Sequence, residues 1–371
     1  MHQGTTDMLT RRAFNMLLAG TVASVGVRPA FAGTSYKMPP ESRWHVGCIM
    51  AFSAAHGLYT PDQIERIRRE QAAVAKAIAG FEPVIMLANA EDAALAQEYC
   101  GENVGVAEMA HYDVWTRDTL PTFVVDGEGQ MAAVSWNFNV WGEKFPDFPG
   151  YDADRDLADR VAGLYGIPMV HADIVAEGGA IEVDGAGTLL TTETCLLNDN
   201  RNPGMSREDV EAELTRLTGA GTVIWLHGSE ADTVTDGHVD GIARFVYPGL
   251  AIAEVSDDPA DPEYDDLMTC AEQLEKAKDA RGEAIEVVRL LRPRWDVMPE
   301  RGDDFAASYV NCFVSNGGIV MPKFGDRERD DAARDLFAKL HPGFEIVQVD
   351  VSEICEGGGG IHCNTQQVPA I

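Results

Sequence analysis

One short pattern recurs along most of the chain and restricts its fold more than any other feature. A turn rich in Gly or Asp leads into a β-rich run, and a segment with helical spacing of apolar residues follows. Such turns start at Asp126, Asp184 and Asn316. A repeated unit of this size buries little apolar surface alone and needs its neighbours. The pattern therefore predicts an α/β fold in which a β-β-α module repeats around a centre, without a linker between independent domains.

The helices of this module are expected between the β-rich runs. Over residues 61–79 apolar side chains recur close to the helical period, and Thr60 and Gln63 have the spacing of a capping box. A strand over 83–87 is expected to lead into a helix over 91–99. Further helices are predicted at 154–165, 206–217, 261–281 and 330–340. The β-rich runs are predicted at 131–138, 188–197 and 319–324.

The first 32 residues have the layout of an export signal. Arg11 and Arg12 form a twin-arginine pair, residues 15–27 are mostly apolar and uncharged, and 30–32 read Ala-Phe-Ala, a small-x-small cleavage site. The apolar run is shorter than the roughly 20 residues that span a bilayer. We therefore expect residues 1–32 to be removed and residues 33–371 to act as a single domain in a bacterial periplasm or outside the cell, without a membrane anchor.

The charge balance excludes some classes of partner. The chain carries 29 Lys and Arg against 60 Asp and Glu, a formal net charge of −31. A field of this sign repels nucleic acid and anionic lipid and attracts small cations. Acidity can also serve solubility alone. The composition therefore predicts no nucleic-acid partner and is compatible with a small cationic substrate.

Seven cysteines, an odd number without regular spacing, argue against a disulfide framework. Since no C-x-x-C pair occurs, a zinc or redox site of that type is not expected. The last of them, Cys363, follows four consecutive glycines at 357–360 and precedes the amide-rich run 364–367. Glycine lets the backbone and a ligand approach closely, and neighbouring donors can stabilise developing charge, which suits a nucleophile. Glycine runs also form plain loops, and single cysteines are commonly inert, so this stretch leaves both interpretations open.

Four further clusters are chemically dense. They are 115–121 with Trp115 and Asp118, 136–142 with two indoles and two amides, Glu177 before two glycines, and 236–240 with His238 and Asp240. If 238–240 is extended, the last two side chains point to the same side. Each cluster alone also fits an ordinary role as a turn cap, a hydrogen-bonded pair or core. A metal site at His238 and Asp240 lacks a third ligand at a recognisable spacing.

Taken together and in this order, the clusters closely resemble the agmatine deiminase family, which also contains the bacterial peptidylarginine deiminases of the guanidino-group-modifying superfamily. The resemblance runs from Met38 to Pro369. It implies a pentein fold, a five-bladed α/β propeller of ββαβ modules around a central active site. The shared motifs are Trp115-x-Arg117-Asp118 with Pro121, Trp136-Asn137-Phe138-Asn139 with Trp141-Gly142, Glu177-Gly178-Gly179, Asn198 with Asn200-Arg201-Asn202-Pro203, Gly237-His238-Val239-Asp240, and Gly358-Gly359-Gly360-Ile361-His362-Cys363 with Thr365-Gln366-Gln367.

The resemblance also implies a role for each catalytic side chain. Cys363 is the nucleophile that attacks the guanidinium carbon, and His238 protonates the departing ammonia and then activates water. Asp118 and Asp240 each grip guanidinium N–H groups, and Glu177 supports the cluster beside His238. Forked hydrogen bonds from paired carboxylates fix a planar guanidinium for attack in a way that charge alone does not.

Substrate contacts are further expected from Trp115, Asp232 and Gly359. No metal or organic cofactor is expected, because water is the second reactant. The implied reaction converts a guanidino group to a ureido group through a cysteine thiouronium intermediate and releases ammonia. The resemblance is also compatible with a homodimer.

The first expectation for the substrate is agmatine, converted to N-carbamoylputrescine on the way to putrescine. Many agmatine deiminases carry acids before the Gly-His-Val-Asp motif, where this chain has Thr233 and Val234, so Asp232 or Asp236 would have to meet the far amine. The main alternative within the fold is deimination of peptidylarginine or of free arginine-like compounds to citrulline. Amidino transfer to an amine and non-catalytic binding of a guanidine are two less favoured functions.

Overall fold

The computed structural model describes residues 35–298, 301–302 and 304–371, so the predicted export signal lies outside the described residues. The described strands form five separate sheets. In sheet order these are β1 (Tyr36–Lys37), β5 (Thr122–Asp126), β6 (Met131–Ser135) and β7 (Met169–His171); β10 (Thr222–Leu226), β9 (Thr188–Thr192) and β8 (Glu182–Val183); β11 (Ala243–Tyr247), β12 (Leu250–Val255) and β13 (Glu286–Leu291); β14 (Phe313–Ser315), β15 (Gly318–Lys323) and β16 (Glu345–Asp350); and β17 (Gln366–Pro369), β2 (His45–Ala51), β3 (Val84–Ala88) and β4 (Val104–Glu108).

Every sheet is built from the same succession of elements. An antiparallel pair is followed by a helix and then by a strand parallel to the second member of the pair. The helix is needed because a parallel neighbour can be reached only by a crossover connection. The α/β class and the repeated module predicted from the sequence are confirmed. The crossover helices are α6 (Leu157–Tyr165), α8 (Arg207–Thr218), α9 (Tyr264–Lys276), α10 (Arg327–Leu340) and α2 (Pro61–Ile78), with α3 (Ala93–Cys100) leading on to β4.

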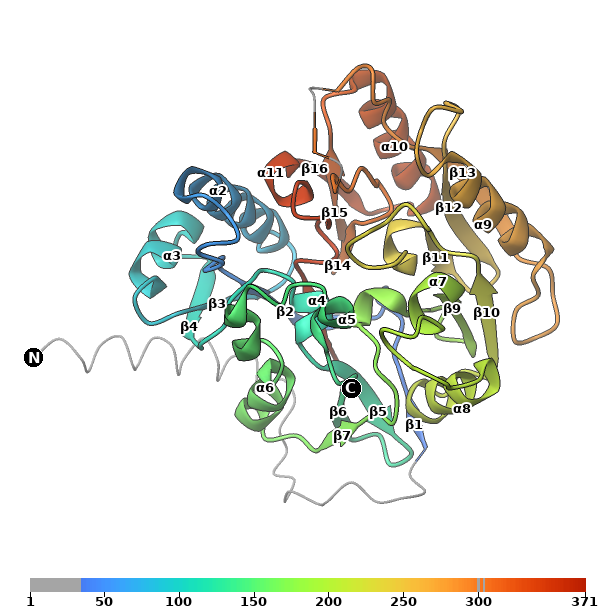
Figure 1. Cartoon of the computed structure of the whole chain (residues 1–371), viewed down its shortest axis with the longest axis horizontal. Helices are drawn as coiled ribbons and strands as arrows, with labels where there is room; N and C mark the ends of the chain where they lie inside the picture. The colour runs from blue at the N-terminus through green and yellow to red at the C-terminus, as the bar shows by residue number, and fades with distance from the viewer. Residues whose placement is uncertain (1–34, 299–300, 303) are drawn as a thin grey trace, which may run out of the picture.

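The two ends of the described chain meet in one sheet. β17 pairs antiparallel with β2, with Gln366 opposite Ile49 and Val368 opposite Gly47. Figure 1 shows the sheets around the middle of the molecule, with the long helices α2, α8, α9 and α10 on the outside. This pairing fixes the segment just before β17, which carries Cys363, near the centre.

Short helical turns, not long helices, approach the centre in Figure 1. All but one of them come after a strand in the order of elements. They are α4 (Thr116–Thr119), α5 (Val140–Glu143), η1 (Pro149–Ala153), η2 (Gly178–Ala180), α7 (Glu193–Leu196), η3 (Val239–Gly241) and α11 (Ser352–Cys355).

Several predicted elements are shorter in the structure. The helix expected over 261–281 is α9, Tyr264–Lys276, because the chain turns at Asp279 and Gly282, where φ is 79°. The β-rich run 188–197 ends at Thr192, where α7 begins, and the run 131–138 ends at Ser135, before Asn137 with φ 58°. In the two strands a local turn overrides the β propensity of the apolar residues that follow.

The apolar faces of the helices close against the sheets. The capping box of α2 is present as predicted, since the Thr60 side chain accepts from the backbone of Gln63 and the Gln63 side chain accepts from the backbone of Thr60. Ile67 and Val74 of α2 are buried in the largest apolar cluster, which also contains Cys363. All seven cysteines are free and buried. None of the helices within the described residues has the length and apolar character needed to cross a membrane.

Candidate active site

Short turns from several parts of the chain meet near the centre. α4 carries Asp118, the residue before η2 is Glu177, η3 starts after His238 and contains Asp240, and Cys363 follows the glycine run. Residues 238–240 are not extended, because Val239–Gly241 form a 3₁₀ turn that begins directly after His238. His238 and Asp240 are nevertheless brought to the same point, as the contacts around Gly179 show below.

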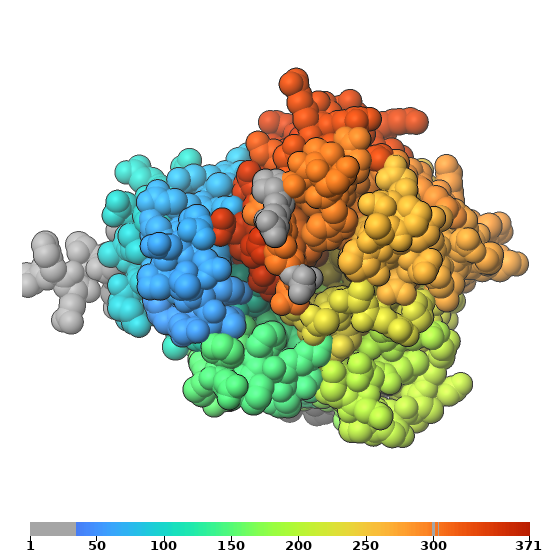
Figure 2. Space-filling view, turned by 45° about the horizontal axis from the view of Figure 1, so that its top comes forward, coloured from blue at the N-terminus to red at the C-terminus, as the bar shows by residue number. Residues whose placement is uncertain are grey.

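A cavity of about 670 Å³ leads to this point from the surface. Figure 2 shows the surface hollowed near its middle, where yellow, orange and red segments meet. The walls of the cavity include the chemically relevant side chains of Asp232, His238, Asp240, Asn311 and Cys363, together with Gly359. Glu177 and Asp118 are buried beside His238.

The Cys363 thiol is 5% exposed and has two polar neighbours. The Asn311 side-chain amide donates to Sγ at 3.1 Å, and Asp240 Oδ2 lies 3.5 Å from Sγ. Burial, followed by the charges of Asp240 and Asp118, raises the pKa of Cys363 well above the ordinary thiol value. The thiol is therefore protonated until a positive charge is brought next to it.

The glycine at 359 is required by close packing against this thiol. A Cβ at Gly359 would lie 2.4 Å from the Trp115 ring and 3.1 Å from Cys363 Sγ. At Gly358 the backbone has φ +87°, a conformation that favours glycine. Close packing at Gly359 and the positive φ at Gly358 thus explain two glycines of the predicted run.

Two carboxylates and an imidazole face a single point above Gly179. A Cβ at Gly179 would lie 2.6 Å from His238 Nδ1 and 3.0 Å from both Asp118 Oδ1 and Asp240 Oδ2. Only a residue without a side chain leaves this point open. Because carboxylates on two sides can each accept N–H groups, the arrangement suits a planar cation with several donors.

The two carboxylates are held in different ways. Asp118 accepts from the Gly179 backbone N–H at 3.0 Å and from Trp141 Nε1 at 2.9 Å, while burial raises its pKa. Asp240 accepts from His362 Nδ1 at 2.7 Å, and although burial acts to raise its pKa, His362 lowers it. Asp240 is therefore the more readily ionised of the two.

His238 is held by a buried ion pair on one ring nitrogen. Its Nε2 lies 3.2 Å from Glu177 Oε2, and Arg201 Nε donates to the other Glu177 oxygen at 2.7 Å. Burial acts to lower the pKa of His238, but Asp118, Cys195 and Glu177 raise it well above 6.5. No described residue hydrogen bonds to His238 Nδ1, which lies 3.8 Å from Asp118 Oδ2. A proton on Nδ1 is thus available at the point where the carboxylates converge.

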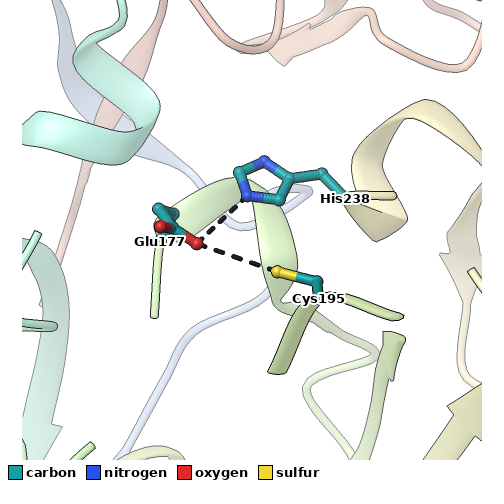
Figure 3. A group of neighbouring side chains, drawn as sticks. All are labelled: Glu177, Cys195 and His238. Atoms are coloured by element: carbon teal, nitrogen blue, oxygen red, sulfur yellow. Dashed lines mark hydrogen bonds and ion pairs between the residues drawn. The ribbon is translucent and has the colours of Figure 1, made fainter. Parts of the chain in front are cut away.

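Glu177, Cys195 and His238 also form a group with the atom types that bind metals. Their ligand atoms lie within 4.8 Å of one another. Figure 3 shows Glu177 between the other two side chains, with contacts to both. However, the buried guanidinium of Arg201 contacts Glu177, so a divalent cation here would be placed beside an existing positive charge. The group fits a hydrogen-bonded cluster that orients His238 and does not fit a metal site.

The remaining predicted contacts are placed as follows. Trp115 lies against the glycine run and donates through Nε1 to Asp113 at 3.0 Å. Asp232 lines the cavity, but its oxygens accept from the backbone N–H groups of its own turn at 2.9 to 3.0 Å. Asp236 is paired with Arg201 and with Lys144, each at 2.7 Å. Neither acid is free of other partners, and their predicted contact with a substrate amine stays a prediction.

Four neighbours of the site were assigned no role from the sequence. Arg201 and His362 lie within the motifs that carry the family resemblance, so their positions in these motifs could have indicated a role at the site. Asn311 and Glu41 gave no signal, since nothing local distinguishes them from other polar residues. Asn311 lines the cavity and contacts His362 and Cys363, and Glu41 contacts the His362 ring, in each case across a long stretch of sequence.

Comparison with known proteins gives concordant matches. The family described as Porphyromonas-type peptidyl-arginine deiminase matches residues 37–369. Two relatives bear the name "Putative agmatine deiminase": one from Legionella pneumophila, 39% identical over 90% of this chain and 95% of its own length, and one from Streptomyces coelicolor, 41% identical over 90% and 99%. The solved structure of the Enterococcus faecalis agmatine deiminase superposes with a TM-score of 0.85 and 31% identity, covering 92% of this chain and 100% of that one. The chain therefore belongs to the Porphyromonas-type peptidyl-arginine deiminase family, in which its relatives include agmatine deiminases.

Proposed function

We propose that this protein hydrolyses the guanidino group of agmatine to a ureido group, forming N-carbamoylputrescine and releasing ammonia. The observation that carries the proposal is the convergence of Asp118, Asp240 and His238 on the point left open by Gly179, with the Cys363 thiol beside it. The names of the similar proteins supply the substrate. The strongly acidic chain favours a cationic substrate of this kind.

Binding and nucleophile activation follow from the charges. A guanidinium between Asp118 and Asp240 is fixed in its plane by forked hydrogen bonds, and its positive charge lies next to Sγ. That charge favours the thiolate and opposes the effect of burial on the thiol pKa. The substrate therefore activates its own nucleophile. A pH series of Cys363 alkylation checks this: a bound, unreactive guanidine is expected to lower the apparent pKa, and an unchanged pKa would contradict it.

His238 carries a proton in both chemical steps, after the proton of the Cys363 thiol has left to solvent as the guanidinium binds. The Cys363 thiolate bonds to the guanidinium carbon, the C–N bond breaks, and the leaving nitrogen takes the His238 proton and departs as ammonia. Neutral His238 then removes a proton from water, which adds to the thiouronium carbon while the C–S bond breaks. The thiolate is restored, and the second water proton leaves with ammonia as ammonium. The Glu177 contact keeps the His238 ring in place in both steps.

A second substrate class has one specific observation in its favour. The cavity of about 670 Å³ is wider than a thin unbranched guanidinoalkyl amine requires. An arginine side chain of a peptide, or free arginine, could enter the same point and yield citrulline. Agmatine and arginine carry the same guanidinium, so only contacts with the rest of the substrate can distinguish the two substrate classes. Asp232 and Asp236, the acids expected to bind the far amine of agmatine, already have other partners in the structure.

The decisive experiment compares three substrates on residues 33–371. Ammonia release is measured with agmatine, free arginine and an arginine-containing peptide, with Cys363→Ala as the control. We expect release from agmatine that the substitution abolishes. Release from the peptide alone would favour protein citrullination, amidinated acceptor in place of ammonia would favour amidino transfer, and binding without turnover would favour a guanidine-binding protein.

We also propose that residues 1–32 direct export by the twin-arginine route and that 33–371 act as one deiminase domain in the periplasm or outside the cell. The Arg11-Arg12 pair and the Ala-Phe-Ala site support this. A homodimer and a contribution to putrescine synthesis are part of the same proposal. N-terminal sequencing of the exported protein is expected to start at Gly33, and an Arg11→Lys, Arg12→Lys variant is expected to stay in the cytoplasm. Export of that variant would contradict the assignment.

A further inference from the structure

A line of buried charged contacts runs away from the site behind Asp240. Asp240 Oδ2 contacts His362 Nδ1 at 2.7 Å, and His362 Nε2 contacts Glu41 Oε2 at 2.7 Å. The other Glu41 oxygen accepts from Arg244 Nη2 at 3.1 Å. All four side chains belong to residues that are 8% exposed or less. Glu41 lies 321 residues from His362 in the sequence, so the segment between β1 and β2 reaches the site through this contact.

The geometry requires that both ring nitrogens of His362 donate. Each nitrogen lies 2.7 Å from a carboxylate oxygen, and a carboxylate only accepts. A neutral imidazole would turn a lone pair toward one of the two carboxylates. Burial and Arg117 act to lower the pKa of His362, but Glu41 and Asp240 outweigh them and raise it. His362 is therefore an imidazolium between two carboxylates.

The contact has a direct consequence at the substrate point. Asp240 Oδ2 is at once bonded to His362 and 3.5 Å from Cys363 Sγ. The imidazolium supplies positive charge to Asp240 in the absence of substrate, so Asp240 stays ionised when no substrate is bound. The backbone N–H of His362 donates to Asn311 Oδ1 at 2.9 Å, so the backbone is held here, while the contacts of the two ring nitrogens hold the ring.

We propose that His362, held by Glu41, is a positioning residue that orients the Asp240 carboxylate and supplies its counter-charge during guanidinium binding. The inference rests on the proposed deimination for its kinetic test. His362 and Asp240 are surrounded by the following charged and titratable groups: Glu41, Arg117, Arg244, Glu182, His238, Asp118 and Cys363.

Two amide substitutions at His362 separate its two contacts. In His362→Asn the amide nitrogen takes the place of Nδ1 and keeps the bond to Asp240, whereas in His362→Gln it takes the place of Nε2 and keeps only Glu41. We expect kcat/KM for agmatine to fall about 100-fold in His362→Gln, as for a misplacement of about 1 Å, and within about tenfold in His362→Asn. We also expect the acidic limb of the pH profile of kcat/KM to move to higher pH in His362→Gln, because Asp240 loses the group that lowers its pKa.

Glu82→Gln is the matched control. Glu82 is also a buried carboxylate paired with a buried imidazole, that of His45 at 3.1 Å. His45 Nε2 contacts the backbone carbonyl of Glu41 at 2.7 Å, but the described hydrogen bonds of this pair do not involve the Glu41 carboxylate, His362 or Asp240. Its loss is expected to lower the thermal midpoint without moving the acidic limb. Equal losses in His362→Asn and His362→Gln, with the acidic limb where the wild-type enzyme has it, would overturn the inference.

A second measurement does not depend on activity. In ¹⁵N NMR of the wild-type protein, the His362 ring, assigned by the signals that His362→Asn lacks, is expected to be protonated on both nitrogens at neutral pH. A neutral ring would overturn the inference whatever the kinetics. If the wild-type protein releases no ammonia from any guanidine while the ring is doubly protonated, the proposed function fails and the contact between His362 and Asp240 stands.

Discussion

Replacing Gly179 by alanine is expected to block the guanidinium point without unfolding the protein. The new methyl group would lie 2.6 Å from His238 Nδ1, whereas ordinary contact begins at 3.4 Å, so the ring must move by 3.4 − 2.6 = 0.8 Å. The methyl would also lie 3.0 Å from Asp118 Oδ1 and from Asp240 Oδ2, in the space that the substrate N–H groups need. The backbone at Gly179 is not left-handed, so alanine adds no backbone strain.

The expected magnitude follows from this displacement. A misplacement of about 1 Å in a catalytic arrangement costs about 100-fold in rate, or about 2.7 kcal/mol in transition-state free energy. We therefore expect kcat/KM for ammonia release from agmatine to fall at least about 100-fold in Gly179→Ala. Calorimetry on the same preparation is expected to show one cooperative transition.

Gly163→Ala is the control for the same chemical change. Gly163 lies on the exposed side of α6, and a Cβ there would meet nothing within 4 Å. This variant is expected to keep wild-type kcat/KM and to gain about 0.5 to 1 kcal/mol of stability, because alanine favours the helix. A kcat/KM close to that of wild type in Gly179→Ala would refute the location of the substrate point.

Three other perturbations test the surroundings of the site and the fold. Arg201→Met removes one of the two charged partners of the buried Glu177, leaving only His238, and is expected to lower the free energy of unfolding by about 3 kcal/mol in a denaturant titration. A double variant that also carries Glu177→Gln should recover part of this, and no recovery would contradict the cause. Asn311→Asp keeps the acceptor for the Cys363 backbone N–H but replaces the donor to Cys363 Sγ by a negative charge, so the pKa of the thiol should rise. Alkylation of Cys363 by a small haloamidine at neutral pH should therefore slow, and faster alkylation would contradict the donor role. Asp326, whose arginine partner lowers its pKa to about 2, contributes stability above its unfolded pKa of about 3.9 that is lost as the pH falls toward 2. Asp326→Asn should therefore cost about 1 kcal/mol at neutral pH, a value reduced by solvent screening of the partly exposed partner, and nothing near the folded-state pKa; an equal cost at both pH values would exclude the ion pair as its cause.

Local sequence patterns carried much of the fold. Hydrophobic periodicity and the capping box of Thr60 placed α2, and the recurring turns placed β9 and β15, because these signals act between residues that are neighbours in the chain. Boundaries were less predictable. β6 and β9 stop where Ser135 and Thr192 are followed by turns whose backbone angles depend on contacts outside the strand.

The candidate site divides in the same way. Cys363, His238, Glu177, Asp118 and Asp240 could be named from the sequence because each lies in a compact motif with glycines or a proline next to it. The motifs do not predict which atoms of these side chains face one another. The 3₁₀ turn at η3, for instance, sets the direction of Asp240, and its geometry follows from packing against the neighbouring segments.

The sequence by itself determined the α/β class, the repeated module and the family, since each depends on residue types at short spacings. Only the tertiary structure decided that Glu41 reaches His362, that Asn311 donates to Cys363, and that Asp232 is committed to its own turn. The physical reason is the closure of the fold. The pairing of β17 with β2 joins the two ends of the described chain, and contacts between residues hundreds of positions apart are fixed by that register and not by any local preference.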